Sequence, residues 1–332
     1  MIELNYYLRK LVYFDKYFEL KQLKKKYRSN KEKGISAYES TNKLLKKPIV
    51  ETKDLELEYA DKIRKGMPFL VARLGNTEGT ILGQYLGKKF GINKGYNDEN
   101  KKWLLTTSGF FADDYENVDD AIDKYAELTL DGLSKVDYLC ARWPESFYQP
   151  FFFHRFARNA VPTSREIWPY ESPTAEMWYS GLAGKKVLVI NSFADSIQRQ
   201  FERKSELVND PSYELPDFDL ITYKSYVTQV GERPGNFRNF FEVLETMEND
   251  IVKLDFDVAI VGAGAYGFPL SVFIKDMGKC VMETCSSTSL YFGVYGQRHI
   301  NCNIERIRTD SWIRPIEQPP QRYKEVENGC YW

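Results

Sequence analysis

Short apolar runs rich in β-branched residues alternate with longer helical segments along most of this chain, from about residue 56 onward. This alternation is typical of an α/β fold, in which a mostly parallel sheet is covered by helices on both faces. Ligands of such open sheets bind outside the carboxyl ends of the strands, so the loops after the strands are the places to look for chemistry. We expect strands at 69–73, 137–141, 186–191, 220–223, 256–261 and 279–284, and helices at 78–87, 118–134, 194–208, 236–253 and 266–277.

Composition narrows the class of protein further. The 332 residues carry a net charge of −1, which argues against a nucleic-acid-coating protein and favours a soluble globular one. Five cysteines without a C-x-x-C pair and only two histidines argue against a zinc site and a disulfide framework. The charged, tyrosine-containing first ten residues do not resemble a secretory leader, so we expect a cytoplasmic protein. The longest uncharged stretch, 258–274, is broken by three glycines and a proline, so no membrane span is expected.

The N-terminal part of the chain differs from the rest in charge. Residues 1–50 contain 13 Lys and Arg against 5 Asp and Glu, and residues 6–27 place apolar side chains at helical spacing. We therefore divide the chain into a basic amphipathic helical arm, residues 1–57, and an α/β domain, residues 58–332. The helix either docks on the body or on a second copy in a homo-oligomer, or residues 1–30 contact an anionic membrane surface as a peripheral protein. Its expected apolar stripe consists of Tyr7, Leu11, Phe14 and Phe18.

The first informative loop follows the strand at 69–73 and reads Arg73-Leu-Gly75-Asn76-Thr-Glu78. The amide oxygen of Asn76 and the carboxylate of Glu78 can face one side of such a turn. They would form an oxygen-ligand pair for a Mg²⁺ or Mn²⁺ ion carried by a diphosphate. The alternative is that Asn76 is only a helix N-cap, with Glu78 in the favourable first turn.

The second informative loop follows the strand at 186–191. Asn191 and Ser192 can present polar groups to a ligand at the start of the next helix, although helix capping explains them equally well. Asp195 has no evident capping duty, which makes it a candidate general base.

The third loop contains a glycine motif. Gly262, Gly264 and Gly267 follow an apolar strand and precede a helix in the pattern G-x-G-x-x-G, with Tyr266 inside the motif and Glu283 sixteen residues after it. This is the fingerprint of a dinucleotide site, in which the glycines allow backbone N–H groups to approach a pyrophosphate. The motif opens the last βαβ unit, however, and too little chain follows to complete a standard dinucleotide half.

Together these loops resemble a bacterial family of glycosyltransferases with the GT-D fold, a Rossmann-like fold, which act in the synthesis of surface polysaccharides and glycoproteins. The resemblance covers roughly residues 58–332, and its most specific part is the glycine-containing block. It rests on residues 71–78, 184–190 with Ser196, Ile197 and Gln200, residues 255–270, then Phe292, Gly293, Gly296 and Arg298, and the terminal Gly-Cys-Tyr-Trp at 329–332.

The resemblance implies a nucleotide-sugar donor and a glycan or lipid-linked acceptor. It makes Glu78 the best metal-site residue and a catalytic one. Asn76 stands where the family has an aspartate, which weakens the expectation of metal dependence. Arg298 would neutralise the leaving diphosphate. The residues that would line the nucleotide site are Arg73, Gly75, Asn191, Ser192, Gly262, Gly264, Tyr266, Gly267 and Glu283. A candidate acceptor region would consist of the aromatic residues Trp143, Tyr148, Trp168, Tyr170 and Trp178. Most aromatic residues of this kind, however, belong to hydrophobic cores.

Two other functions remain open at this point. Gly262, Gly264, Gly267 and Glu283 also suit an oxidoreductase that uses NAD(P). The unusual Asn76 also suits a non-catalytic protein that binds a sugar nucleotide, or a partner enzyme, within an assembly complex. The sequence indicates neither the sugar nor the acceptor.

Overall fold

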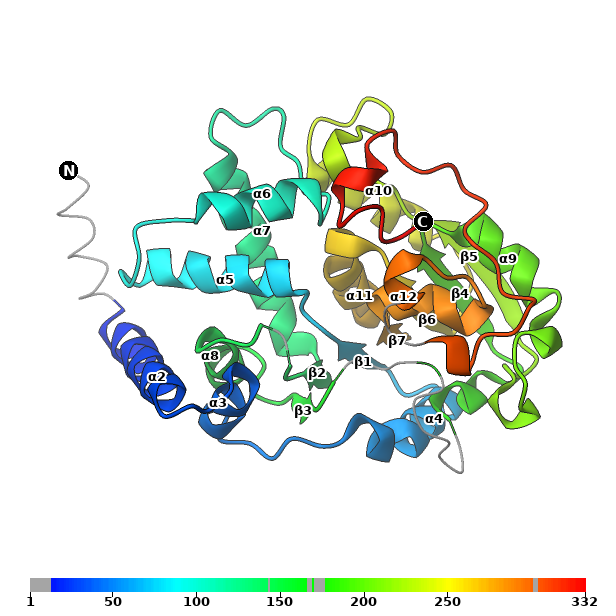
Figure 1. The fold of residues 1–332 in the computed structure, drawn as a ribbon, viewed down its shortest axis with the longest axis horizontal. Helices are drawn as coiled ribbons and strands as arrows, with labels where there is room; N and C mark the ends of the chain where they lie inside the picture. Colours follow the sequence, from blue (N-terminus) through cyan, green and yellow to red (C-terminus); the bar gives the residue numbers. More distant parts are fainter. Residues whose placement is uncertain (1–12, 143, 166–168, 170–176, 301–303) are drawn as a thin grey trace.

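A single seven-stranded sheet forms the centre of the molecule (Figure 1). The computed structural model describes residues 13–332 except 143, 166–168, 170–176 and 301–303. All strand pairs of the sheet are parallel, and the spatial order is β3-β2-β1-β7-β6-β4-β5. The strands are β1 Phe69–Ala72, β2 Tyr138–Cys140, β3 Val161–Thr163, β4 Lys186–Asn191, β5 Asp219–Lys224, β6 Val258–Gly262 and β7 Cys280–Glu283.

The six predicted strands are confirmed, and one further strand, β3, was not predicted. Its three residues are too few to show a pattern, and Pro162 lies in the middle of them. A proline lacks the N–H that a central strand needs, but it is tolerated in a strand at the edge of a sheet. β3 is such an edge strand, since it pairs only with β2 inside the sheet.

Helices cover both faces of the sheet, as predicted. Alternate residues of each central strand enter two different hydrophobic clusters: Leu188 and Ile190 face one side, whereas Val187 and Val189 face the other. The first cluster packs against α5 Asn76–Lys89, α7 Val118–Gly132, α10 Phe240–Ile251 and α11 Gly267–Asp276. The second packs against α4 Glu56–Arg64, the turn at Trp178–Leu182 and α9 Ala194–Phe201. The chain is therefore an α/β protein with a Rossmann-like architecture.

The predicted helix at 194–208 is wrong beyond Phe201, where α9 ends. Leu207 is buried in a separate small cluster with Trp312, whose indole N–H donates to the Leu207 carbonyl oxygen at 2.7 Å. Leu207 therefore packs outside the helix. The helices α6 Asp98–Thr106 and α8 Tyr148–Arg155 were not predicted at all.

The basic arm contributes α2 Phe14–Glu32 and α3 Ala37–Leu44, which lie beside α8 (Figure 1). Leu20 and Leu23 of α2 are buried in the same cluster as the core of the sheet. Of the expected stripe, Tyr7 and Leu11 lie outside the described residues, whereas Phe14 and Phe18 are 62% and 50% exposed and so are not buried by docking. The division at residue 57 stays a prediction. Within the described residues, no helix combines the length and the apolar character that a membrane crossing requires.

Candidate active site

A cleft of about 430 Å³ opens at the carboxyl ends of β1, β4, β6 and β7. This is the edge at which open α/β sheets bind ligands, beside the points where the strand order reverses. The cleft brings together most of the residues that the sequence predicted. These are Arg73, Gly75, Asn76, Glu78, Asn191, Ser192, Gly262, Gly264, Tyr266, Glu283 and Arg298, whereas Asp195 and Gly267 do not line it.

The first loop places Glu78 at the mouth of the cleft. Gly75 is the N-cap of α5 and Asn76 is its first residue, so the alternative that Asn76 caps the helix is wrong. The Glu78 side chain folds back over Gly75, since a Cβ added to Gly75 would lie 1.9 Å from Glu78 Oε2. Only glycine at position 75 leaves room for this carboxylate, which lies in the first turn of the helix, where the backbone dipole favours negative charge.

Glu283 ends β7 and lies beside β1, with which that strand pairs. The Arg73 backbone N–H donates to Glu283 Oε2 at 3.4 Å, and the Cys285 thiol donates to Oε1 at 3.8 Å. Burial raises the pKa of the Glu283 carboxyl to about 8, and the nearby charge of Glu78 adds to the rise while Arg73 opposes it. The cleft therefore holds two interacting carboxyl groups, and one of them changes its charge close to neutral pH.

The glycines of the third loop have structural duties in this chain. A Cβ on Gly262 would lie 2.3 Å from the Cys285 carbonyl oxygen, so Gly262 lets the turn at Cys285–Phe292 cross the end of β6. Gly264 has a φ of 55°, which favours glycine. A Cβ on Gly267 would lie 3.2 Å from Glu283 Oε1, so a carboxyl group lies beside the start of α11. That position is where the pyrophosphate of a dinucleotide would sit.

The second loop divides its residues between the cleft and the surface. Asn191 donates from Nδ2 to the Gly262 carbonyl oxygen at 2.9 Å and accepts from the Phe193 backbone N–H at 2.9 Å, so its side chain fixes the loop. Ser192 lines the cleft. The structure does not bring Asp195 there: its carboxylate is 61% exposed and pairs with Lys224 at 2.6 Å. Its predicted role as a general base therefore lacks support from the geometry.

Tyr266 forms a fixed wall of the cleft. Its ring is buried and stacks on Phe240 with ring centroids 4.3 Å apart and an interplanar angle of 5°. Its hydroxyl lies 3.0 Å from Thr228 Oγ1. Because Tyr266 is only 1% exposed and one face of its ring lies on Phe240, it shapes the cleft without offering a ring face to a nucleotide base.

The C-terminal segment forms a wall that the predicted site residues do not include. Arg298 donates from Nη1 to the Tyr331 hydroxyl at 3.1 Å and from Nη2 to Glu327 at 2.6 Å, and its guanidinium lies 4.6 Å from the centre of the Tyr331 ring. Glu327, Tyr331 and Trp332 all line the cleft. The only sequence signal for this wall was the terminal Gly-Cys-Tyr-Trp within the family resemblance.

His299 also lines the cleft and was missed. Its Nδ1 accepts from the Gly296 backbone N–H at 2.9 Å, so its Nε2 carries the proton and donates to the Ser286 carbonyl oxygen at 3.1 Å. Burial lowers the pKa of the imidazole to about 4, and the adjacent Arg298 lowers it further. His299 is thus a neutral link between the turn after β7 and the segment that carries Arg298.

No group of three or more His, Cys, Asp and Glu side chains that could hold a metal ion occurs in the described part of the chain. A Mg²⁺ ion bound through a diphosphate needs fewer protein ligands than such a group provides, because it keeps several waters and uses only one or two carboxylates. Glu78 and Asn76 both line the cleft, but they lie two positions apart in α5, a spacing at which helical side chains do not face each other. Glu78 therefore offers one carboxylate to an ion that arrives with its phosphate ligand, and the predicted ligand pair of Glu78 with Asn76 does not form on one face of the helix.

The two predicted acceptor aromatics among the described residues, Tyr148 and Trp178, do not line this cleft. Trp178 is fully buried and donates from Nε1 to the Tyr291 hydroxyl at 3.1 Å, which marks it as a core residue. Tyr148 lines a different groove. Trp143, Trp168 and Tyr170 lie outside the described residues.

Comparisons with known proteins return little for this chain. No family model matches it, and no curated protein matches it. It is similar to a solved, selenomethionine-substituted structure described as domain of unknown function 1792, with 12% sequence identity and a TM-score of 0.37 over 88% of this chain and 98% of that one. The functional argument therefore rests on the geometry of the cleft.

Proposed function

We propose that this chain is a glycosyltransferase that moves a sugar from a nucleotide-sugar donor to a glycan or lipid-linked acceptor, in the synthesis of surface polysaccharides or glycoproteins. The observation that carries the proposal is the pairing of Glu78 and Glu283 in one cleft with Arg298. Sugar transfer from a diphosphate needs groups that accept a proton and groups that stabilise a leaving anion. This cleft contains both kinds.

Glu283 is the group that we assign to proton transfer. A carboxyl with a pKa of about 8 exchanges its proton near neutral pH, which suits a residue that must accept the proton of an acceptor hydroxyl. In the reaction the acceptor oxygen forms a bond to the anomeric carbon as the sugar–phosphate bond breaks. The hydroxyl proton passes to the ionised Glu283, and the bonding electron pair leaves with the diphosphate.

Arg298 is the group that we assign to the leaving diphosphate. The Arg298 side chain is 27% exposed and is held by Glu327, so a phosphate would have to share or displace that carboxylate. The start of α5 is covered by the Glu78 carboxylate, so we do not assign it to the phosphate groups. A Mg²⁺ or Mn²⁺ ion carried by the donor would be held by Glu78, and it would supply further positive charge to the leaving group.

The NAD(P)-dependent oxidoreductase remains the second candidate, because β6, α11 and β7 form a βαβ unit with Glu283 at its end. Against it, the Glu283 carboxyl lies beside Gly267, where a pyrophosphate would meet it. A non-catalytic sugar-nucleotide-binding protein is the third candidate.

A panel of ligands separates these candidates. Thermal shifts are measured with UDP, GDP, CMP, ADP and NAD(H), each with and without Mn²⁺, on the unmodified chain and on Glu78→Gln. We expect a nucleoside diphosphate to stabilise the chain, and Mn²⁺ to add to the shift except in Glu78→Gln. The matched control Glu99→Gln removes an exposed carboxylate from α6 and should behave like the unmodified chain. Stabilisation by NAD(H) without an effect of any diphosphate would refute the proposal.

Turnover decides between an enzyme and a binding protein. Release of nucleoside diphosphate from the sugar nucleotides that bind is measured with and without candidate acceptors. The proposal expects release that depends on Glu78 and Glu283. Tight donor binding without any turnover would favour the non-catalytic alternative.

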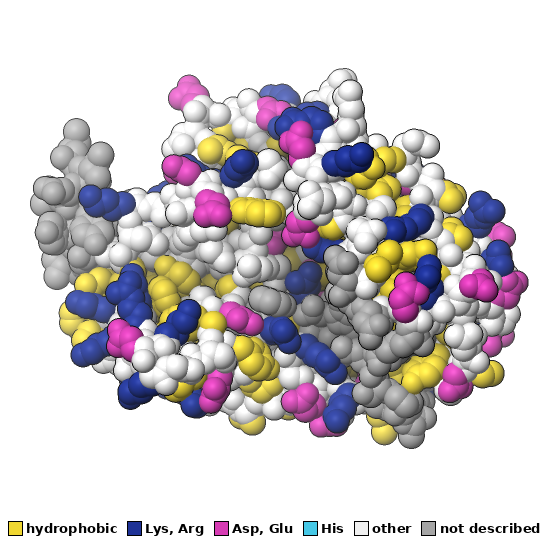
Figure 2. All heavy atoms as spheres, in the orientation of Figure 1, with side chains coloured by type: hydrophobic (Ala, Val, Ile, Leu, Met, Phe, Trp, Pro, Cys, Tyr) yellow, Lys and Arg dark blue, Asp and Glu magenta, His cyan; other side chains and the backbone are white. Residues whose placement is uncertain are grey.

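We also propose that residues 1–30 bring the protein to anionic membranes, because lipid-linked acceptors lie there. Phe14 and Phe18 are exposed and stack on each other with centroids 6.1 Å apart. Figure 2 shows basic side chains gathered around the N-terminal helices, and each can add about 1 kcal/mol near anionic headgroups. Co-sedimentation with phosphatidylserine vesicles should be salt-sensitive and should weaken in Phe18→Ser. Equal binding by the variant, or none by either, would eliminate this role.

A further inference from the structure

A second groove, of about 460 Å³, lies along α5, away from the cleft described above. It is bordered by α2, by α5 with the loop that follows it, and by the start of α8 (Figure 1). The residues that define its chemistry are Lys24, Thr80, Gln84, Asn93, Tyr96 and Phe147. The reaction proposed for the cleft uses none of them.

One face of α5 joins the groove to the cleft. Asn76 lines the cleft, whereas Thr80 and Gln84 line the groove. Successive members of this series are four residues apart, so the three side chains lie on one face of the helix. Eight residues of helix span about 12 Å, so an elongated ligand in the groove would point its end at the cleft.

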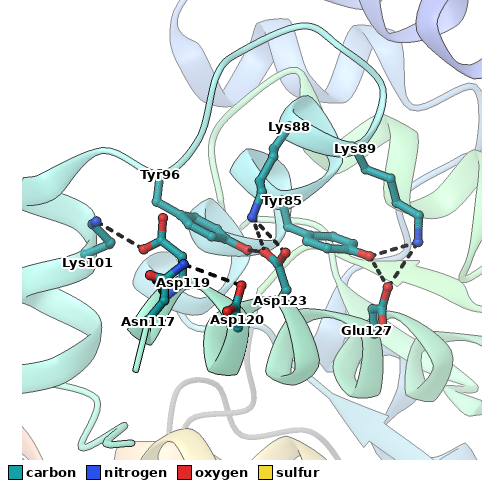
Figure 3. A network of polar contacts seen from close by, with 10 residues as sticks. All are labelled: Tyr85, Lys88, Lys89, Tyr96, Lys101, Asn117, Asp119, Asp120, Asp123 and Glu127. Carbon is teal, nitrogen blue, oxygen red and sulfur yellow. Dashed lines mark hydrogen bonds and ion pairs between the residues drawn. The ribbon is translucent and has the colours of Figure 1, made fainter. Parts of the chain in front are cut away.

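The walls of the groove are fixed by contacts below them. Tyr148 packs directly on the backbone of α5, since a Cβ on Gly83 would lie 2.3 Å from the Tyr148 ring. The Tyr96 hydroxyl donates to Asp123 of α7 at 2.6 Å, and Lys88 pairs with the same carboxylate at 2.7 Å (Figure 3). Because Asp123 holds the ring of Tyr96 in place, a ligand would not need to order this wall.

The groove carries positive charge that the described residues do not neutralise. Lys24 and Lys94 line it, and neither forms an ion pair with any described carboxylate. Lys24 Nζ lies 5.7 Å from the centre of the Phe147 ring. Partial burial lowers the pKa of Lys24, and the charge of Arg28 lowers it further. An anionic group on a ligand would relieve this repulsion.

The groove also combines hydrogen-bonding groups with aromatic faces. Gln84 accepts from the Asn97 backbone N–H at 2.8 Å through Oε1, and its amide nitrogen has no partner among the described residues. The buried Asn93 Oδ1 also lacks a partner there. The rings of Phe147 and Tyr96 are only partly buried. Saccharides present hydroxyl groups at their edges and C–H groups on their faces, which match amides and aromatic rings respectively.

We infer that the groove along α5 binds an anionic oligosaccharide and serves as the distal subsite for the acceptor, with the end of the acceptor directed along Asn76, Thr80 and Gln84 into the cleft. The assignment of this oligosaccharide as the acceptor of the reaction rests on the proposed function. Binding of an anionic saccharide at the groove can be measured without any donor.

The test measures direct binding by calorimetry with a hexasaccharide of alternating glucuronate and N-acetylglucosamine, a neutral hexasaccharide of N-acetylglucosamine, and inorganic phosphate. The acidic hexasaccharide should bind more tightly than the neutral one. Lys24→Glu should weaken it by about tenfold or more, as expected for the loss of a charge-assisted hydrogen bond. Lys25→Glu is the matched control, because it makes the same charge change on an exposed side chain one position further along α2, and it should leave the affinity unchanged.

The packing part of the inference is tested by Phe147→Ala, which should weaken both hexasaccharides without changing nucleotide binding at the cleft. Circular dichroism and melting temperature verify that each variant is folded. Equal losses in Lys24→Glu and Lys25→Glu, or displacement of the hexasaccharide by inorganic phosphate alone, would overturn the inference, since either result would show attraction by charge only. Nucleotide binding is measured on the same samples, so the cleft and the groove can fail separately.

Discussion

Replacing Glu283 by Gln should make this protein more stable at alkaline pH, although it removes a residue that we assign to catalysis. The Glu283 side chain is only 6% exposed, and burial raises its pKa from an ordinary 4.5 to about 8. Below pH 4.5 the carboxyl is neutral in both the folded and the unfolded chain. As the pH rises, the unfolded chain loses this proton first, so the folded state loses stability until the folded carboxyl also ionises near pH 8.

The size of the effect follows from the two pKa values. Each pH unit between them costs the folded state about 1.4 kcal/mol, so the contribution of Glu283 falls by about 5 kcal/mol in total and by about 3 kcal/mol between pH 5 and pH 7. Glutamine has almost the same shape and never ionises. The difference in unfolding free energy between Glu283→Gln and the unmodified chain should therefore grow by these amounts in favour of the variant.

Urea unfolding at pH 5, 6, 7 and 8.5, followed by circular dichroism, measures this difference. Glu99→Gln, which removes an exposed carboxylate, serves as the control for the general loss of one negative charge. A stability difference that does not change with pH would refute the reasoning, because it would mean that Glu283 is solvated or fully paired. A variant that becomes less stable than the unmodified chain as the pH rises would refute it as well.

Four further substitutions test the packing of the site and of the arm. Gly75→Ala should reduce the turnover of sugar transfer at least severalfold, because the added methyl group displaces the flexible end of Glu78. It should change the free energy of unfolding, measured with urea, by less than about 1 kcal/mol, because nothing else is displaced. Gly262→Ala should destabilise the fold by about 1–3 kcal/mol or more, since its Cβ meets the Cys285 backbone, and a stable variant would show that the turn can move. Leu20→Ala should lower the free energy of unfolding, measured with urea, by about 2–5 kcal/mol, whereas Phe18→Ala should lower it by less than about 0.5 kcal/mol. Equal effects would contradict the docking of α2 through Leu20 with Phe18 exposed.

The sheet was predictable because its central strands are short, continuous apolar runs between helical segments. β4 and β6 are almost entirely buried, so nearly every side chain in them had to be apolar. β3 and α8 were harder to predict, since each is short and contains a proline, a residue that usually interrupts strands and helices. In α8 the proline lies near the start of the helix, where its missing N–H costs nothing.

Much of the cleft was predictable because parallel strands end at the same edge of a sheet. Glu78 and Glu283 lie more than 200 residues apart in the chain, yet both follow strands that pair with each other. The position of Asp195 outside the cleft was not predictable, because the sequence could not show which way the first turn of α9 faces, and the side chain points to Lys224. The wall formed by Glu327 and Tyr331 comes from an irregular segment without periodicity, so no pattern located it.

The pairing of β1 with β7 also sets a problem for synthesis of the chain. β1 is completely buried, and Phe69 lies beside Cys280, a partner that is translated 211 residues later. At about 5–20 residues per second, the ribosome needs roughly 10–40 s to deliver that partner. During this interval an apolar strand that belongs at the centre of the sheet has an unpaired edge, which exposes nascent chains to aggregation. Slower translation between the two strands should therefore lower the yield of soluble protein, and a chaperone that covers apolar segments should restore it.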